Sequence, residues 1–242
     1  MTIDYLGQGF YGWQKQHRGR TIQGELEKAL AVLLREPVKV TGASRTDTGV
    51  NARGFAVNFK TDSKITPDRL ARSLNGLLPK GISVTGAENV PEEWHARKSA
   101  VYREYEYLIW NRIYPDIFRA ETTTHLRKPL NIEAMRAAAA DVVGEHDFKA
   151  FCVASSAGKG CVRRIFFLKI DEPEPGLVRL TIRANGFVHK MARSIVGTLM
   201  DIGLGKREIG LVAELLKTGD RKLAGRTAPA NGLTLTKIEY EK

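Results

Sequence analysis

The hydrophobic pattern of this chain alternates between strand and helix periodicity, and the same order of elements occurs twice. In the first half, two stretches carry apolar residues at helical spacing, from Thr21 to about residue 34 and from Thr66 to about residue 78. Short stretches typical of strands lie around them, at residues 1–5, 38–41, 55–60 and 82–88. The resulting order, β-α-β-β-α-β, is that of a ferredoxin-like unit.

The second half repeats this order with longer strands. A strand is expected at residues 101–109, a helix at about 131–143, two strands at 164–171 and 177–185, helices from about 187 and about 209, and a closing strand at 233–240. The pattern predicts an α+β fold of two ferredoxin-like units, residues 1–100 and 101–242, sharing a mixed, mainly antiparallel sheet. Because no flexible linker separates the units and ligand sites are common at domain junctions, we expect an active-site cleft between them.

Composition excludes several classes of protein. The hydrophobic fraction of 43% excludes a disordered chain, and no apolar run approaches the roughly 20 residues of a membrane span. The N-terminal residues do not resemble a secretion signal, and two cysteines in 242 residues do not predict a disulfide framework. The five scattered histidines predict no metal site. We therefore expect a cytoplasmic protein without a bound metal.

The charge balance points to a polyanionic partner. The chain has 38 Lys and Arg against 27 Asp and Glu, a formal charge of +11, and nucleic acid is the commonest soluble polyanion. A glycine-rich loop at residues 7–19, together with the adjoining Arg20, provides four candidate RNA-binding residues: Trp13, Lys15, Arg18 and Arg20. They could stack on unpaired bases or hold phosphates, or the loop could bury Trp13 and leave the cations in solvent. No phosphate-binding glycine motif occurs, so a nucleotide cofactor has no support.

Three further side chains are candidates for chemistry. Asp47 lies in the run Ser44-Arg45-Thr46-Asp47-Thr48-Gly49-Val50-Asn51, whose composition favours a tight turn, so it is either a turn residue or a catalytic carboxylate. Tyr105 shares one side of its strand with Arg103 and Tyr107, as a sheet aromatic or a base-stacking platform. Arg193 follows His189 by four residues, so both are expected on one face of a helix.

Six segments together resemble one family, tRNA pseudouridine synthase A, in the order that the family has them. They are Gly12-Trp13-Gln14, Ser44-Arg45-Thr46-Asp47-Thr48-Gly49-Val50, His95-Ala96-Arg97, Tyr105-Glu106-Tyr107, Ala184-Asn185-Gly186-Phe187-Val188-His189-Lys190-Met191-Ala192-Arg193 and Thr227-Ala228-Pro229-Ala230-Asn231-Gly232-Leu233. The resemblance implies a homodimeric isomerase that converts uridine to pseudouridine at positions 38, 39 and 40 in the anticodon stem-loop of tRNA.

The resemblance also implies roles for four residues. Asp47 would be the catalytic aspartate and Arg193 would pair with it. Tyr105 would stack on the target base, while Arg45 would hold the target nucleotide out of the helix or fill the space that it leaves. The isomerisation adds no group and changes no oxidation state, so no cofactor is expected.

The sequence departs from the family's pattern at two positions of the run from Ser44 to Asn51. Ser44 stands where many relatives have Gly, and Asn51 stands where His is usual. Two other functions remain open from the residues alone. One is a non-catalytic RNA-binding protein on the same fold, and the other is a uridine-modifying enzyme that the loop at residues 154–164 directs to another RNA.

Overall fold

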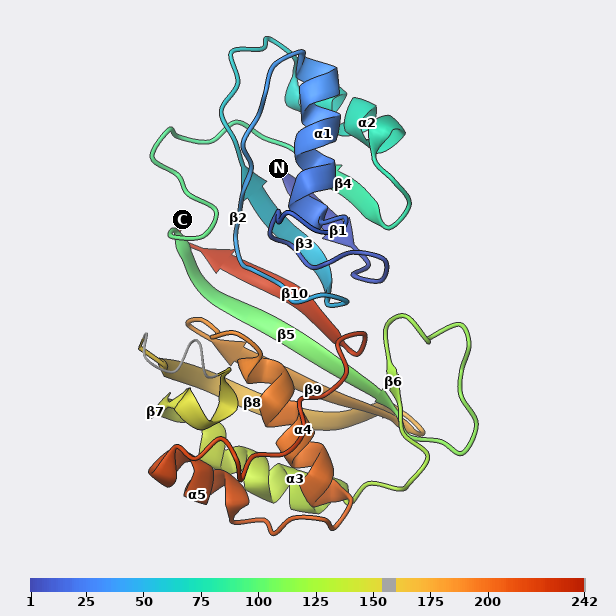
Figure 1. Cartoon of the computed structure of the whole chain (residues 1–242), viewed down its shortest axis with the longest axis vertical. Coiled ribbons are helices and arrows are strands. Elements are labelled where there is room, and N and C mark those ends of the chain that lie inside the picture. Colours follow the sequence, from blue (N-terminus) through green and yellow to red (C-terminus); the bar gives the residue numbers. More distant parts are fainter. Residues whose placement is uncertain (154–159, 242) are drawn as a thin grey trace. The chain divides into compact units, whose positions relative to one another are not determined.

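The chain forms two compact units in the computed structural model, which describes residues 1–153 and 160–241 (Figure 1). Unit 1 comprises Met1–Val101 together with the C-terminal segment from Thr234, and unit 2 comprises Tyr102–Leu233. The first boundary between the units, between Val101 and Tyr102, lies one residue from the boundary expected from the sequence. The C-terminal segment differs from the expectation, since it belongs to unit 1 and not to the second unit.

Unit 1 has the predicted order of elements, followed by one additional strand. The elements are β1 (Thr2–Tyr5), α1 (Ile22–Leu34), β2 (Thr41–Gly42), β3 (Asn51–Asn58), α2 (Pro67–Leu77), β4 (Ile82–Gly86) and β10 (Leu233–Tyr240). Neighbouring strands in the order β4-β1-β3-β2 are antiparallel, which is the arrangement of a split βαβ unit. Strand β10 pairs with β3 in parallel, with Thr234 opposite Asn51, so the sheet is mixed.

The helices of unit 1 begin where the sequence predicts. The Thr21 hydroxyl accepts a hydrogen bond from the Gly24 N–H at 3.2 Å and caps α1, and Pro67 occupies the first turn of α2. Figure 1 shows α1 and α2 side by side next to the strands. Their apolar faces form one core with the sheet, in which the following side chains are fully buried: Ile3, Ile22, Leu26, Leu30, Phe55, Val57 and Leu74.

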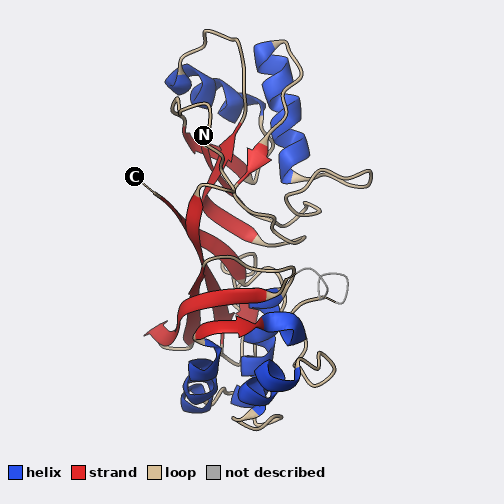
Figure 2. Cartoon of the chain, turned by 90° about the vertical axis from the view of Figure 1, so that its left-hand side faces the viewer, coloured by secondary structure: helices blue, strands red, loops and turns tan. Residues whose placement is uncertain are grey.

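Unit 2 is also built from one sheet and its helices. The elements are β5 (Ala100–Trp110), β6 (Thr124–His125), α3 (Ile132–Ala139), β7 (Gly144–Asp147), β8 (Val162–Glu174), β9 (Leu177–Ala184), α4 (Met191–Gly203) and α5 (Leu211–Thr218), with short 3-10 turns at Ala140–Val142 and Phe148–Phe151. The strands lie in the order β5-β9-β8-β7 with antiparallel neighbours, and β6 joins β5 in parallel. In Figures 1 and 2 the three α-helices are gathered beside these strands.

Several elements differ from the sequence-based expectation. The strand expected at residues 38–41 is reduced to Thr41–Gly42, because the backbone of Val40 bonds instead to the side chains of Glu27 and Gln23 on α1. The helix expected from about residue 187 begins at Met191, since Lys190 has the left-handed φ of 64° and cannot continue a helix. His189 therefore precedes the helix, and the prediction that it shares a helical face with Arg193 is wrong. The short strands β6 and β7 were not expected.

The described residues contain no helix that is both long enough and apolar enough to cross a membrane.

Candidate active site

Asp47 lies between β2 and β3. We call residues 44–51, which include the first residue of β3, the Asp47 loop. The Asp47 carbonyl oxygen accepts a hydrogen bond from the Val50 N–H at 3.1 Å, and Gly49 adopts a φ of 79°. The tight turn predicted from the composition is therefore present, and it closes directly after Asp47. The Asp47 side chain is half-buried.

The Asp47 loop is fastened to the first strand and to the glycine-rich loop that follows it. The Thr46 carbonyl oxygen accepts a hydrogen bond from the Trp13 N–H at 3.1 Å. The Thr46 hydroxyl lies 2.8 Å from the Tyr5 hydroxyl. Asn51, which is 2% exposed, accepts a hydrogen bond from the Gly7 N–H at 2.8 Å through its side-chain oxygen. This bond gives a structural role to the residue that departs from the family's usual His.

Two glycines allow the backbones of these segments to touch. A Cβ at Gly12, where φ is 78°, would lie 2.7 Å from the Thr46 carbonyl oxygen. A Cβ at Gly7 would lie 2.4 Å from the Val50 carbonyl oxygen. Side chains at either position would push the Asp47 loop away, so glycine is required for its present place.

Trp13 is a core residue, and the prediction that it contacts RNA is wrong. Its side chain is 2% exposed and packs on Phe55, with ring centroids 4.5 Å apart, and on Tyr5 at 6.5 Å. Gly42 makes room for the indole, because a Cβ there would lie 2.4 Å from it. The alternative, that the loop buries Trp13, is the observed one.

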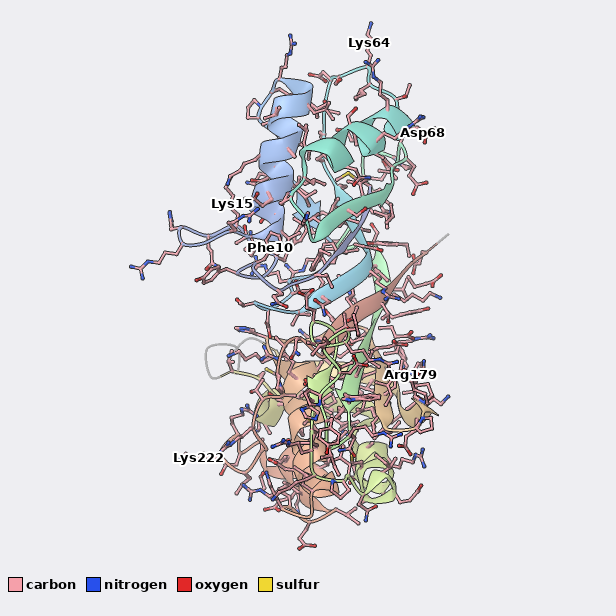
Figure 3. All side chains as sticks on the ribbon, turned by 90° about the vertical axis from the view of Figure 1, so that its right-hand side faces the viewer. Phe10, Lys15, Lys64, Asp68, Arg179 and Lys222 are labelled. Atoms are coloured by element: carbon pink, nitrogen blue, oxygen red, sulfur yellow. The ribbon has the colours of Figure 1, made fainter. Side chains whose placement is uncertain are left out.

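The three basic residues of the same loop are accessible, and two of them bind carboxylates of α1. The Lys15 ammonium lies 2.8 Å from Glu27, and the Arg20 guanidinium lies 3.1 Å from Glu25. Figure 3 shows Lys15 beside the start of α1. Arg18 and Arg45 are exposed. The roles of these four cations with RNA stay predictions, and those of Lys15 and Arg20 require that phosphate compete with a carboxylate.

Tyr105 lies in β5 on the side predicted from the strand alternation. Tyr105, Tyr107 and Ile109 are buried, whereas the alternating residues Glu104 and Glu106 are partly exposed. The Phe187 ring meets the Tyr105 ring edge-on, with centroids 4.9 Å apart and an interplanar angle of 83°. The resemblance motif at residues 184–193 therefore packs directly on Tyr105. Base stacking by Tyr105 stays a prediction and requires an open ring face when RNA binds.

Arg193 is the third residue of α4, and it is bonded in both directions to the segment at residues 225–228. Its Nε donates to the Ala228 carbonyl oxygen at 2.8 Å, and the Ala228 N–H donates to the Arg193 carbonyl oxygen at 3.0 Å. Gly197 lies one turn later, where a Cβ would be 1.7 Å from the Arg226 carbonyl oxygen. Because Asp47 belongs to unit 1 and Arg193 to unit 2, their pairing stays a prediction, as does the cleft expected between the units.

Tyr107 holds the next part of the same segment. Its hydroxyl is 2.6 Å from that of Thr124 and donates to the Pro229 carbonyl oxygen at 3.0 Å. Burial raises the pKa of Tyr107 to about 12, so this phenol stays neutral and serves as a donor. Sequence reasoning missed the supporting residues Tyr5, Thr46 and Tyr107, although all three carry hydroxyls near the candidate residues.

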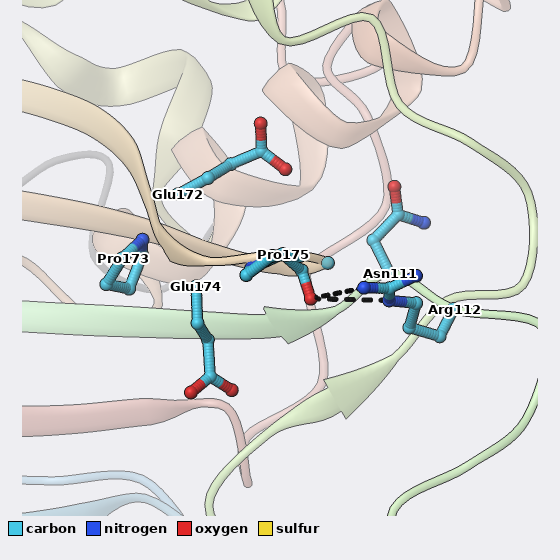
Figure 4. Close-up of a pocket in the computed structure, with 7 residues that line it drawn as sticks. Asn111, Arg112, Glu172, Pro173, Glu174 and Pro175 are labelled. Carbon is cyan, nitrogen blue, oxygen red and sulfur yellow. Dashed lines mark hydrogen bonds between the residues drawn. The ribbon is translucent and has the colours of Figure 1, made fainter.

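The pocket in Figure 4 belongs to unit 2. It lies at the turn between β8 and β9, has a volume of about 550 Å³, and is lined by Asn111, Arg112 and residues 172–176. The Arg112 guanidinium is bound to the Pro175 carbonyl oxygen, at 2.8 Å from one nitrogen, and two glutamates share the turn. None of the sequence-predicted site residues lines this pocket.

Comparison with known proteins agrees with the resemblance. A family model described as tRNA pseudouridine synthase matches residues 1–97 and 138–241. The chain is 41% identical over 240 residues to tRNA pseudouridine synthase A of Ruminiclostridium cellulolyticum, covering 99% of this chain and 98% of the relative. It is 42% identical over 242 residues to the protein of the same name in Bacillus subtilis, with the same coverage.

A solved structure titled "Crystal Structure of a Cbf5-Nop10-Gar1 Complex" is similar at a TM-score of 0.42 and 10% identity, over 98% of this chain and 48% of that chain. This similarity is too low to add to the assignment. The family model covers most of the chain, and each of the two relatives matches 99% of the chain. The chain therefore belongs to the tRNA pseudouridine synthase family.

Proposed function

We propose that this protein converts uridine to pseudouridine in tRNA, at positions 38, 39 and 40 of the anticodon stem-loop. The observation that carries the proposal is the family membership of the whole chain, at 41% and 42% identity to two relatives named tRNA pseudouridine synthase A. The Asp47 loop is held in place by hydrogen bonds to β1 and to the glycine-rich loop, and this fixed position supports the choice of Asp47 as the catalytic group.

The reaction breaks the bond between N1 of the base and C1′ of the ribose and joins the same base through C5. No atom is added and no electron is transferred, so acid-base or nucleophilic chemistry by protein side chains is sufficient. Asp47 either attacks the sugar or assists its deprotonation. Arg193 would favour the ionised carboxylate, because a nearby guanidinium stabilises the charged form.

The target uridine must leave the base stack before Asp47 can reach it. Base extrusion costs a few kcal/mol, and stacking on an aromatic ring offsets part of that cost. Tyr105 would supply the ring, with its position fixed by Phe187. Arg45 is exposed one residue before the buried Thr46, and it would hold the extruded nucleotide or fill the space left in the helix.

The charge of +11 suits a partner with a phosphate backbone, since neutralising phosphates dominates the affinity of most RNA-binding proteins. We further infer that the protein acts in the cytoplasm, where tRNA is present, and works as a homodimer. The homodimer is implied by the resemblance.

The test is pseudouridine mapping after incubation of the purified protein with an unmodified tRNA transcript that has uridine at positions 38, 39 and 40. A transcript with cytidine at these positions is the matched control. We expect pseudouridine at these positions in the first transcript and no product in the second.

The two alternative functions give different results in the same experiment. Binding without product would support a non-catalytic RNA-binding protein and refute the enzyme. Product elsewhere in the tRNA, or only in another RNA, would support a synthase with another target. The loop at residues 154–164, to which we assign such a change of target, lies partly outside the described residues.

A further inference from the structure

Two buried hydroxyl groups meet at Thr46, the residue directly before Asp47. The Tyr5 hydroxyl lies 2.8 Å from the Thr46 hydroxyl, and the two side chains come from residues that are 41 positions apart in the chain. Tyr5 is 4% exposed and Thr46 is 8% exposed. Thr46 is covalently joined to Asp47, so any rotation of its backbone changes the direction of the Asp47 side chain.

Tyr5 is a rigid support for this contact. It is the last residue of β1, where it lies opposite Ala52 of β3 and Ile82 of β4. Its ring meets the edge of the Phe55 ring, with centroids 5.5 Å apart, and it stacks on Trp13 at 6.5 Å. A phenol fixed by two strands and two aromatic rings holds its oxygen at one point in the core of unit 1.

The contact holds the Asp47 loop through a side chain at the residue directly before Asp47. The bond from Trp13 reaches the Thr46 backbone, and the bond between Gly7 and Asn51 lies four residues beyond Asp47. A backbone bond alone leaves the peptide unit after Thr46 able to tilt. The hydroxyl pair adds a second point of attachment on the same residue, which opposes that tilt.

A valine at position 46 and a phenylalanine at position 5 would fill almost the same space without any polar group to satisfy. Buried hydroxyls add little net stability compared with apolar groups of the same shape. The pair is therefore poorly explained by stability alone. Its placement one residue before the candidate catalytic carboxylate supports an effect on the reaction.

We propose that Tyr5 and Thr46 are positioning residues, whose hydrogen bond sets the direction of Asp47 for the chemical step. The proposal rests on the function proposed above. A misplaced catalytic group lowers the rate of reaction and leaves most of the RNA contacts in place. The predicted effect is therefore on the single-turnover rate, with little effect on the tRNA dissociation constant.

The experiment compares the full-length wild type with Tyr5→Phe, Thr46→Val, Thr46→Ser and the double variant Tyr5→Phe/Thr46→Val. Single-turnover rates are measured with saturating enzyme on the tRNA transcript, tRNA dissociation constants by filter binding, and folded fractions by circular dichroism. Tyr240→Phe is the matched control. Its hydroxyl donates to the Ala96 carbonyl oxygen at 2.8 Å, in the same unit but outside the Asp47 loop.

We expect Tyr5→Phe and Thr46→Val to lower the single-turnover rate by about tenfold to a hundredfold, since small displacements of a reacting group have effects of this size. The double variant should be no slower than the slower single variant, because both changes remove the same bond. Thr46→Ser retains the hydroxyl and should restore most of the rate. Tyr240→Phe should match the wild type.

The inference is overturned if folded Tyr5→Phe and Thr46→Val react at the wild-type rate, if their loss is confined to tRNA affinity, or if Tyr240→Phe is equally slow. If Thr46→Val does not fold, Tyr5→Phe decides the outcome by the same criteria. The wild type separates this inference from the proposed function. No product from the wild type refutes the function itself, whereas normal product from both the wild type and Tyr5→Phe refutes only the positioning role.

Discussion

Gly12→Ala is the substitution for which the structure predicts the clearest effect on the Asp47 loop. Gly12 has a φ of 78°, so alanine there adopts a left-handed conformation that costs about 1–2 kcal/mol. In addition, the new Cβ would lie 2.7 Å from the Thr46 carbonyl oxygen and 3.1 Å from the Asp47 carbonyl carbon. Both contacts are with backbone, which cannot swing away as the end of a side chain can.

Gly9→Ala separates these two effects. Gly9 has nearly the same φ, 81°, but a Cβ there meets nothing within 4 Å. We expect Gly9→Ala to lower the free energy of unfolding by about 1–2 kcal/mol, the conformational cost alone. Gly12→Ala should lower it by a further 1–3 kcal/mol, roughly the usual cost of overpacking.

Activity provides the second part of the test. Relief of the contact at Gly12 requires the backbone at Thr46 and Asp47 to move, so the single-turnover rate per folded molecule should fall by about tenfold or more. Gly9→Ala should keep the wild-type rate. Urea unfolding and single-turnover kinetics on the tRNA transcript measure the two quantities. Equal stability and equal rates in the two variants would refute the argument that the glycine-rich loop fixes the place of Asp47.

Three further outcomes are expected. Hydrogen bonds from Arg179 on β9 lower the pKa of Asp171 to about 2. The ionised Asp171 therefore contributes its full stabilisation above about pH 4, and this contribution is lost as the pH falls toward 2. Asp171→Asn should therefore lower the free energy of unfolding by about 1–2 kcal/mol at pH 7, after allowance for solvent screening, and by almost nothing near pH 2; a constant difference in urea unfolding across this range would contradict the pairing. Tyr105→Phe should reduce single-turnover activity less than Tyr105→Ala, since the stacking ring survives, and equal losses would assign the role to the hydroxyl. Gly197→Ala should destabilise unit 2 strongly, because the new Cβ would lie 1.7 Å from the Arg226 carbonyl oxygen. Gly76→Ala in α2 is the control: its Cβ would have no neighbour within 4 Å, so this change should be neutral or stabilising. Similar unfolding midpoints for the two variants would refute the close packing of α4.

Local features of the fold could be predicted from the sequence because they depend on neighbouring residues. The Thr21 cap, the Pro67 start of α2 and the alternating burial along β5 all follow from patterns a few residues long. The turn at Asp47 follows from the composition of its own loop.

Features that depend on distant residues were missed. Trp13 lies in a glycine-rich, basic segment that is typical of a surface loop, but Gly42 and Phe55 provide the space and the ring that bury it. The membership of β10 in unit 1 depends on its pairing with β3, across most of the chain. No local pattern encodes such pairings.

The candidate site shows the same division. The motifs single out Asp47, Tyr105 and Arg193, but they do not reveal what holds each of them. The Tyr5 hydroxyl, the Phe187 ring and the Ala228 carbonyl oxygen become visible as supports only in the folded units.

The central claim is that Asp47 performs the chemistry, and Asp47→Asn tests it most directly. Asp68→Asn is the matched control, because it removes one carboxylate from an exposed position at the start of α2 in the same unit (Figure 3). Both variants and the wild type are incubated with the transcript carrying uridine at positions 38, 39 and 40, and pseudouridine formation and tRNA affinity are measured together. We expect Asp47→Asn to form no product while its tRNA dissociation constant stays within about tenfold of the wild type, since phosphate contacts dominate binding. Asp68→Asn should equal the wild type in both measurements. Substantial turnover by Asp47→Asn would contradict the account and remove Asp47 from the catalytic role.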